Sequence, residues 1–215
     1  MLRHPRFASL SAISAMSAIV LALVAAVPAS AQNAPPVRIR GTVESIEAGS
    51  VNVLTREGKQ LKLATSDATR YSAIKALDMS SIKQGSFIGT AGKPTANGGV
   101  EALEVVVFPE EARGSGEGHY DWDLLPGSSM TNATVSAVVS GNSGRELNLT
   151  YQGKNIQVKV PQNVPVVTFV PATAADLKAG LTVFVIGARD AADASGEKLK
   201  AVRVVMEKDG VKPPM

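Results

Sequence analysis

Two copies of one pattern follow each other along the chain, and this duplication limits the fold more than any other feature. Three stretches of the first half recur in the same order in the second half: 41–46, 50–55 and 58–63 match 133–138, 146–150 and 153–158. Gly58 and Gly153 are 95 residues apart, as are Gly85 and Gly180. A matched order at a nearly constant spacing indicates a duplicated structural unit. We therefore expect two similar small domains.

Each copy has the pattern of β-strands. Apolar and polar residues alternate along 50–55 and 60–63, a period of two that turns one set of side chains towards a core and the other towards water. The alternation predicts eight core residues, four in each copy: Val43, Val53, Leu61 and Leu63, matched by Val135, Leu149, Ile156 and Val158.

One short helix per copy is expected between the strands. It should precede Gly85, with Ser80 or Ser81 as its N-cap, and precede Gly180, with Thr173 as its N-cap. Five or six strands with one small helix favour a closed barrel, because closure removes exposed strand edges. The fold prediction is thus all-β, with two tandem OB-like Greek-key small β-barrels. A pair of open sandwiches is the alternative architecture.

The N-terminus is typical of a secretory signal peptide. Arg3, His4 and Arg6 precede an apolar run at 13–27, and small residues follow up to Ala31. The run is shorter than the ~20 residues that a membrane span needs, which disfavours an uncleaved anchor. We expect residues 1–31 to be removed and the protein to be periplasmic, with no membrane span in the mature chain.

These features set the expected domain bounds. The predicted parts are a signal peptide at 1–31, a first barrel at 37–108, an acidic Gly-rich linker at 109–130, a second barrel at 131–207 and a C-terminal tail at 208–215.

Charge and cysteine content narrow the classes of function. Without Arg3 and Arg6, the mature chain has 20 basic and 19 acidic residues and is nearly neutral. Its aromatic residues are not interleaved with Lys or Arg clusters, so nucleic acid is not an expected partner. With no cysteine, disulfides, thiol nucleophiles and thiolate metal sites are excluded.

The predicted linker holds the candidate binding residues. Trp122 is the only tryptophan, and with Tyr120 and Leu124 it forms a candidate contact surface for a partner. The alternative is a site for a divalent metal, whose nitrogen and oxygen ligands would be His119, Glu117, Asp121 and Asp123. A single histidine is a weak metal signature, and the same segment also fits a flexible linker that covers the junction between the barrels.

The repeat motifs carry a family resemblance. They read Arg-Gly-Thr-Val at 40–43, Gly-Lys-Gln-Leu at 58–61, Ile-Lys-Gln-Gly at 82–85 and Glu-Ala-Leu-Glu-Val at 101–105. Each copy resembles a family of exported bacterial barrel domains of unknown function. The whole chain, including 116–119 and 130–135, also resembles proteobacterial proteins often labelled metal-transport permeases. A mature chain without spans cannot itself be a permease.

The sequence therefore predicts a non-catalytic periplasmic binding or interaction module, with an unknown periplasmic protein or small ligand as its partner and no cofactor. A metal-binding or metal-delivery accessory protein that uses the His119 segment is the alternative. Enzymatic activity is not expected, because no nucleophile–base pattern accompanies the only histidine of the mature chain.

Overall fold

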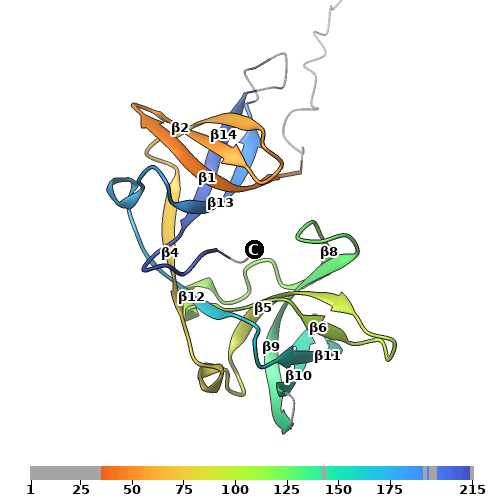
Figure 1. Cartoon of the computed structure of the whole chain (residues 1–215). Helices are drawn as coiled ribbons and strands as arrows, with labels where there is room; N and C mark the ends of the chain where they lie inside the picture. Colours follow the sequence, from red (N-terminus) through yellow and green to blue (C-terminus); the bar gives the residue numbers. More distant parts are fainter. Residues whose placement is uncertain (1–34, 142–143, 191–192, 194–197, 214–215) are drawn as a thin grey trace, which may run out of the picture.

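Strands make up most of the computed structural model, which describes residues 35–141, 144–190, 193 and 198–213 (Figure 1). The predicted signal peptide at 1–31 lies outside the described residues. The strands of the first half are β1 (Val37–Glu47), β2 (Ser50–Thr55), β3 (Gln60–Ala64), β4 (Arg70–Ala76), β5 (Phe87–Pro94), β6 (Val100–Ala102) and β7 (Val105–Val107). Those of the second half are β8 (Gly118–Trp122), β9 (Ser128–Gly141), β10 (Gly144–Tyr151), β11 (Lys154–Pro161), β12 (Val166–Pro171), β13 (Thr182–Arg189) and β14 (Leu199–Met206). The all-β prediction is confirmed.

The first barrel is a closed ring of five strands. Antiparallel pairs join β13 to β1, β1 to β2 and β2 to β3, a parallel pair joins β3 to β14, and an antiparallel pair joins β14 back to β13. This is the pairing order of an OB-type Greek-key barrel. Its core is centred on residues such as Val53, Leu63 and Val185.

The second barrel repeats this ring with the complementary strands. Here β5 pairs with β9, β9 with β10, β10 with β11, β11 in parallel with β6, and β6 with β5. The short β7 continues the line of β6 and also pairs with β5. Its core includes Leu147, Leu149 and Val158. Both rings are closed, so open sandwiches are not what the chain forms.

Each barrel is assembled from both copies of the repeat, which corrects the expected domain bounds. The first barrel takes β1–β3 from the first copy and β13 and β14 from the second, and the second barrel takes β9–β11 from the second copy and β5–β7 from the first. Figure 1 shows this exchange as orange and blue strands that lie side by side in one barrel. The segments 37–108 and 131–207 are therefore sequence repeats, and neither closes a barrel by itself.

The crossover strands β4 and β12 connect the two barrels. They pair antiparallel with each other, and Ile74 lies opposite Phe169. These two residues are 95 positions apart and so occupy equivalent places in the two copies. A pseudo-two-fold axis thus passes through this pair. Along each crossover, β4 also pairs in parallel with β14, and β12 with β7.

The burial of the predicted core residues agrees with the strand alternation. Six of the eight are buried: Val43, Val53, Leu63, Val135, Leu149 and Val158. Leu61 and Ile156 are partly buried and pack against the two cores. The faces of the strands were therefore predicted correctly in both copies.

The predicted short helices are 3₁₀ turns, at Met79–Ser81 (η2) and Ala174–Asp176 (η4). Thr173 is the N-cap of η4, as expected, and its backbone N–H donates to the Asp176 carboxylate. In the first copy the N-cap is Asp78, so the prediction of Ser80 or Ser81 was wrong. Both serines lie inside the turn.

The predicted linker at 109–130 is largely structured. It contains a 3₁₀ turn at Glu110–Ala112 (η3) and the strand β8, which pairs with β9 from Gly118–Asn132 to Trp122–Ser128. β9 itself begins at Ser128, before the expected start of the second barrel. No helix within the described ranges is long and apolar enough to cross a membrane.

Candidate functional site

A third apolar cluster lies between the two barrels and defines the junction. Its buried members come from β4, β7, β12, β13 and β14: Ile74, Val106, Val167, Phe184 and Val205. Trp122, Phe169, Ile186 and Val211 are partly buried and pack against it. The junction is therefore a core in its own right, built on the outer faces of both barrels.

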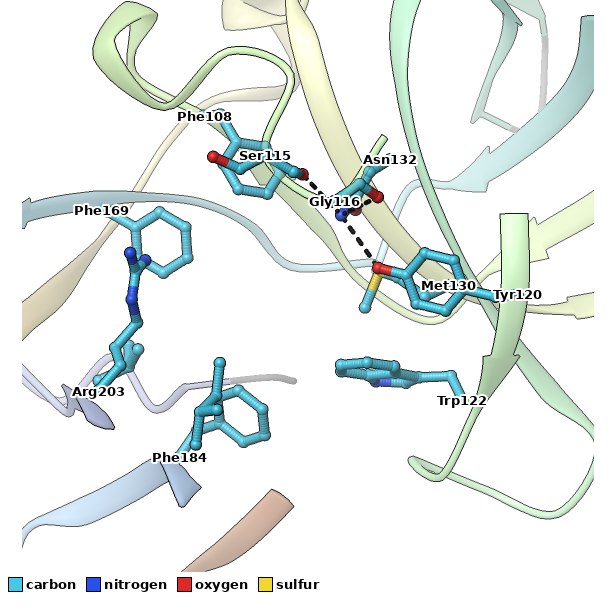
Figure 2. Close-up of a pocket in the computed structure, with 12 residues that line it drawn as sticks. Phe108, Ser115, Gly116, Tyr120, Trp122, Met130, Asn132, Phe169, Phe184 and Arg203 are labelled. Carbon is cyan, nitrogen blue, oxygen red and sulfur yellow. Dashed lines mark hydrogen bonds between the residues drawn. The ribbon is translucent and has the colours of Figure 1, made fainter. Parts of the chain in front are cut away.

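A cavity of about 290 Å³ opens into this junction (Figure 2). The second-barrel side supplies Phe108, Ser115, Gly116, Tyr120, Trp122, Met130 and Asn132, and the other side supplies Phe169, Phe184, Ile186, Arg203 and Val205. Because the two walls come from different barrels, the cavity exists only when both barrels are formed and docked.

The pleat of β8 separates the candidate residues of the former linker into two groups. Side chains of a strand alternate between its two faces, so Tyr120 and Trp122 share one face while His119 and Asp121 share the other. Tyr120 and Trp122 line the cavity, although Tyr120 is also 37% exposed. His119 and Asp121 are exposed and do not line it. Leu124, the third predicted contact residue, is partly buried and does not line the cavity.

Trp122 is held by cations and by rings. The guanidinium carbon of Arg38 lies 4.0 Å from the centroid of the indole, a cation–π contact. On β13, the ring of Phe184 lies 6.4 Å away between centroids. Asp123 anchors the arginines, since its carboxylate lies 2.8 Å from Arg40 and 3.8 Å from Arg38. β8 is thus fastened across the junction onto β1 of the other barrel.

A polar network fixes the loop that leads into β8. The Asn132 side-chain amide donates to the backbone carbonyls of Ser115 and Gly116 and lies 3.2 Å from the Tyr120 hydroxyl. Burial raises the pKa of Tyr120 above its usual value. Its hydroxyl therefore stays neutral and serves as a hydrogen-bonding group in the cavity wall.

Two lining residues have buried polar atoms without a hydrogen-bond partner in the structure. They are the Asn132 side-chain oxygen and the Trp122 indole nitrogen. A buried polar atom that lacks a partner costs roughly 1–3 kcal/mol, so the junction is not optimised for packing alone.

The four predicted metal ligands are not brought together. His119 contacts Thr131 through Nδ1 at 2.8 Å, Glu117 accepts the backbone N–H of Gln152, and Asp123 pairs with the arginines of β1. Asp121 is exposed on β8. Within the described part of the chain, no three His, Cys, Asp or Glu side chains lie close enough to hold a metal ion.

Glu104 is a buried carboxyl on the junction side of the second barrel. It lies between β6 and β7 and is 1% exposed, and neither of its carboxyl oxygens has a hydrogen-bond partner. Burial raises its pKa to about 8, although the charge of Arg40 acts in the opposite direction. Glu104 is therefore protonated in the folded protein at neutral pH.

Sequence reasoning missed most of the cavity wall beyond β8. Phe184 stands where the first copy has Gly89, Phe169 where it has Ile74, and Arg203 where it has Glu104. A comparison of the two copies position by position marks these as places where they differ in size or charge. Such differences between otherwise matched copies are the sequence signal that points to the junction.

No family model, curated protein or solved structure matches the chain, so its function is inferred from the geometry of the junction.

Proposed function

We propose that this chain is a non-catalytic binding protein of the bacterial periplasm that holds a small ligand at the junction of its two barrels. The observation that carries the proposal is the cavity of about 290 Å³, whose walls come from both barrels. Tyr120 and Trp122, which the sequence singled out as a contact surface, lie in this wall.

The composition of the lining supports binding rather than catalysis. Ligand sites are mostly apolar concave surfaces with a few polar groups that orient the ligand. Here the polar side chains of the lining are those of Ser115, Tyr120, Asn132 and Arg203. They offer hydrogen bonds and one positive charge, and none of the described residues that line the cavity has a carboxylate or imidazole to act as a general base.

The location rests on the N-terminal segment. A basic start, an apolar run and small residues up to Ala31 support export. A ligand-binding role outside the cytoplasm is consistent with a chain that has no cysteine and depends on three apolar cores. The metal-delivery alternative gains no support, because Glu117, His119 and Asp123 each interact with a different partner and no three potential ligands come together among the described residues.

A ligand screen tests the proposal. The chain purified from the periplasm of an expression host should gain thermal stability with at least one compound in a library of small metabolites, because a ligand that binds only the folded state raises its stability. Trp122→Ala and Phe169→Ala change opposite walls of the cavity, and both should abolish this gain.

Ile46→Ala serves as the matched control, since Ile46 is a large apolar residue that is 47% exposed on β1 and does not line the cavity. It should keep the stabilisation. A library without any stabilising compound, or hits that survive in both cavity variants, would contradict the proposal.

A further inference from the structure

The rings around the cavity form two groups that face one another. Phe108 and Phe169 lie 5.7 Å apart between centroids. Tyr120 lies 6.1 Å from Trp122, which in turn lies 6.4 Å from Phe184. Figure 2 shows open space between these two groups. Aromatic faces and edges bind a flat ring favourably in stacked or edge-on contact, so the walls suit a planar aromatic group.

The charge of the cavity lining indicates which kind of planar ligand it would bind. Among the described residues that line the cavity, Arg203 is the only one with a charged side chain. Its guanidinium has no ion pair or hydrogen bond to a described residue. The other arginines of the junction, Arg38 and Arg40, are already paired with Asp123. An unpaired guanidinium at an apolar cavity favours a carboxylate, which it can bind through two parallel hydrogen bonds.

The size of the cavity limits the ligand. A water molecule occupies about 30 Å³ of liquid, so 290 Å³ corresponds to roughly ten non-hydrogen atoms of that size. One or two fused rings with one acidic group are close to this size, whereas a long acyl chain or a folded peptide is much larger.

We infer that the ligand of the junction is a mono- or bicyclic aromatic carboxylate, with its rings between the two aromatic groups and its carboxylate on Arg203. This inference rests on the proposed binding function and specifies its ligand class. Arg203 occupies the place that the buried Glu104 takes in the first copy. Of these two equivalent residues, only Arg203 is charged at neutral pH, and only Arg203 lines the cavity.

The test compares 2-naphthoate with 2-naphthamide, which has the same rings and no charge. Isothermal titration calorimetry should show binding of the naphthoate in the micromolar range and binding of the amide at least about tenfold weaker, the expected loss of a charge-assisted hydrogen bond. Trp122 is the only tryptophan of the chain, so a change in tryptophan emission on binding places the ligand at this cavity.

Arg203→Met should weaken naphthoate binding about tenfold or more and abolish the preference over the amide. Arg203→Lys keeps the charge without the planar fork and should retain part of the preference. Lys200→Met is the control, because Lys200 is an exposed cation of the same strand that does not line the cavity and pairs with Asp190. It should leave both affinities unchanged.

Equal affinity for naphthoate and naphthamide would contradict the inference that Arg203 binds a carboxylate. The cavity would then be a site for an uncharged aromatic ring. Failure of both probes, together with a library compound of another class whose stabilisation is lost in Trp122→Ala, would overturn the inferred ligand class while the proposed function stands. Failure of both probes and of the whole library would overturn both.

Discussion

The free energy of unfolding is expected to fall steadily as the pH rises from about 4.5 to about 8, and Glu104→Gln is expected to remove this fall. In the unfolded chain the Glu104 carboxyl titrates near its ordinary pKa of 4.5, whereas burial raises its pKa to about 8 in the folded protein. Between these values the folded state holds a proton that the unfolded state releases.

The sign follows from this difference in bound protons. Below pH 4.5 the Glu104 carboxyl is protonated in both states, and its contribution to stability is fully present. Each pH unit above that costs about 1.4 kcal/mol, so a few kcal/mol are lost by the time the pH passes the folded-state pKa. The large effect arises because the carboxyl is 1% exposed and its oxygens have no hydrogen-bond partner to favour the ionised form.

Urea denaturation at several pH values measures this profile. Glu101→Gln is the matched control, since Glu101 lies on β6, is exposed and pairs with Lys159 at 3.5 Å. It should leave the slope of the wild-type profile intact. A wild-type stability that is flat across this pH range would show that the Glu104 carboxyl is not buried in the folded protein.

Gly92→Ala is expected to destabilise the protein by about 2–3 kcal/mol, whereas the equivalent change in the second copy, Gly187→Ala, should be tolerated. A Cβ at Gly92 would lie 2.3 Å from Val100 Cγ1 and 2.6 Å from the Glu101 carbonyl oxygen. The second contact is with backbone of the paired strand β6, which cannot yield as a flexible side chain can, and such overpacking is costly.

At Gly187 the nearest atom to a Cβ would be the Lys200 carbonyl oxygen at 3.5 Å, an ordinary contact. Alanine there restricts the unfolded chain and should change stability by no more than about 1 kcal/mol in either direction. Chemical denaturation of the two variants checks the contrast. Equal effects at both positions would mean that the two barrels are packed alike at this point.

The sequence was sufficient to predict the local structure of the strands. Alternation around Val53 and Leu149 identified the core faces, because burial of a strand face depends on a period of two. Gln152 and Gly153 have φ values of 47° and 74°, the left-handed conformation of a tight hairpin turn that a glycine between two strands favours.

Such patterns do not predict which strand pairs with which. β13 and β5 are equivalent in the two copies, so the sequence pattern allows β1 to pair with either of them. Alternation and turn residues are local properties. They do not predict whether the chain after β4 completes the barrel of β1–β3 or crosses to the other barrel. The exchange of strands, and with it the junction, is therefore visible only in the folded chain.

The candidate site was predicted in part for the same reason. Trp122 and Tyr120 stood out as aromatic residues in an acidic segment, but their opposite wall comes from Phe169, Phe184 and Arg203. These residues become neighbours of Trp122 only through the strand exchange. The metal ligands were proposed from proximity in sequence, and the pleat of β8 placed His119 and Asp121 on the face away from the cavity.

The reciprocal strand exchange is the central feature, because it builds both closed barrels and the cavity between them. It can be tested by a disulfide, since the chain has no cysteine of its own. Thr42 on β1 and Thr182 on β13 are Cα partners in the first barrel. Partners in adjacent antiparallel strands lie about 4.5–5.5 Å apart, within reach of a disulfide.

The measurement uses the Thr42→Cys, Thr182→Cys double variant with a protease site inserted between Pro126 and Gly127, in the turn after β8. After oxidation, cleavage and denaturation, the two halves should migrate as one species that reduction separates. Thr42→Cys with Leu54→Cys is the control, because this pair joins β1 to β2 within one half and must release the halves on cleavage. If the Thr42–Thr182 variant also releases two separate halves, each copy closes its own barrel and the strand exchange is wrong.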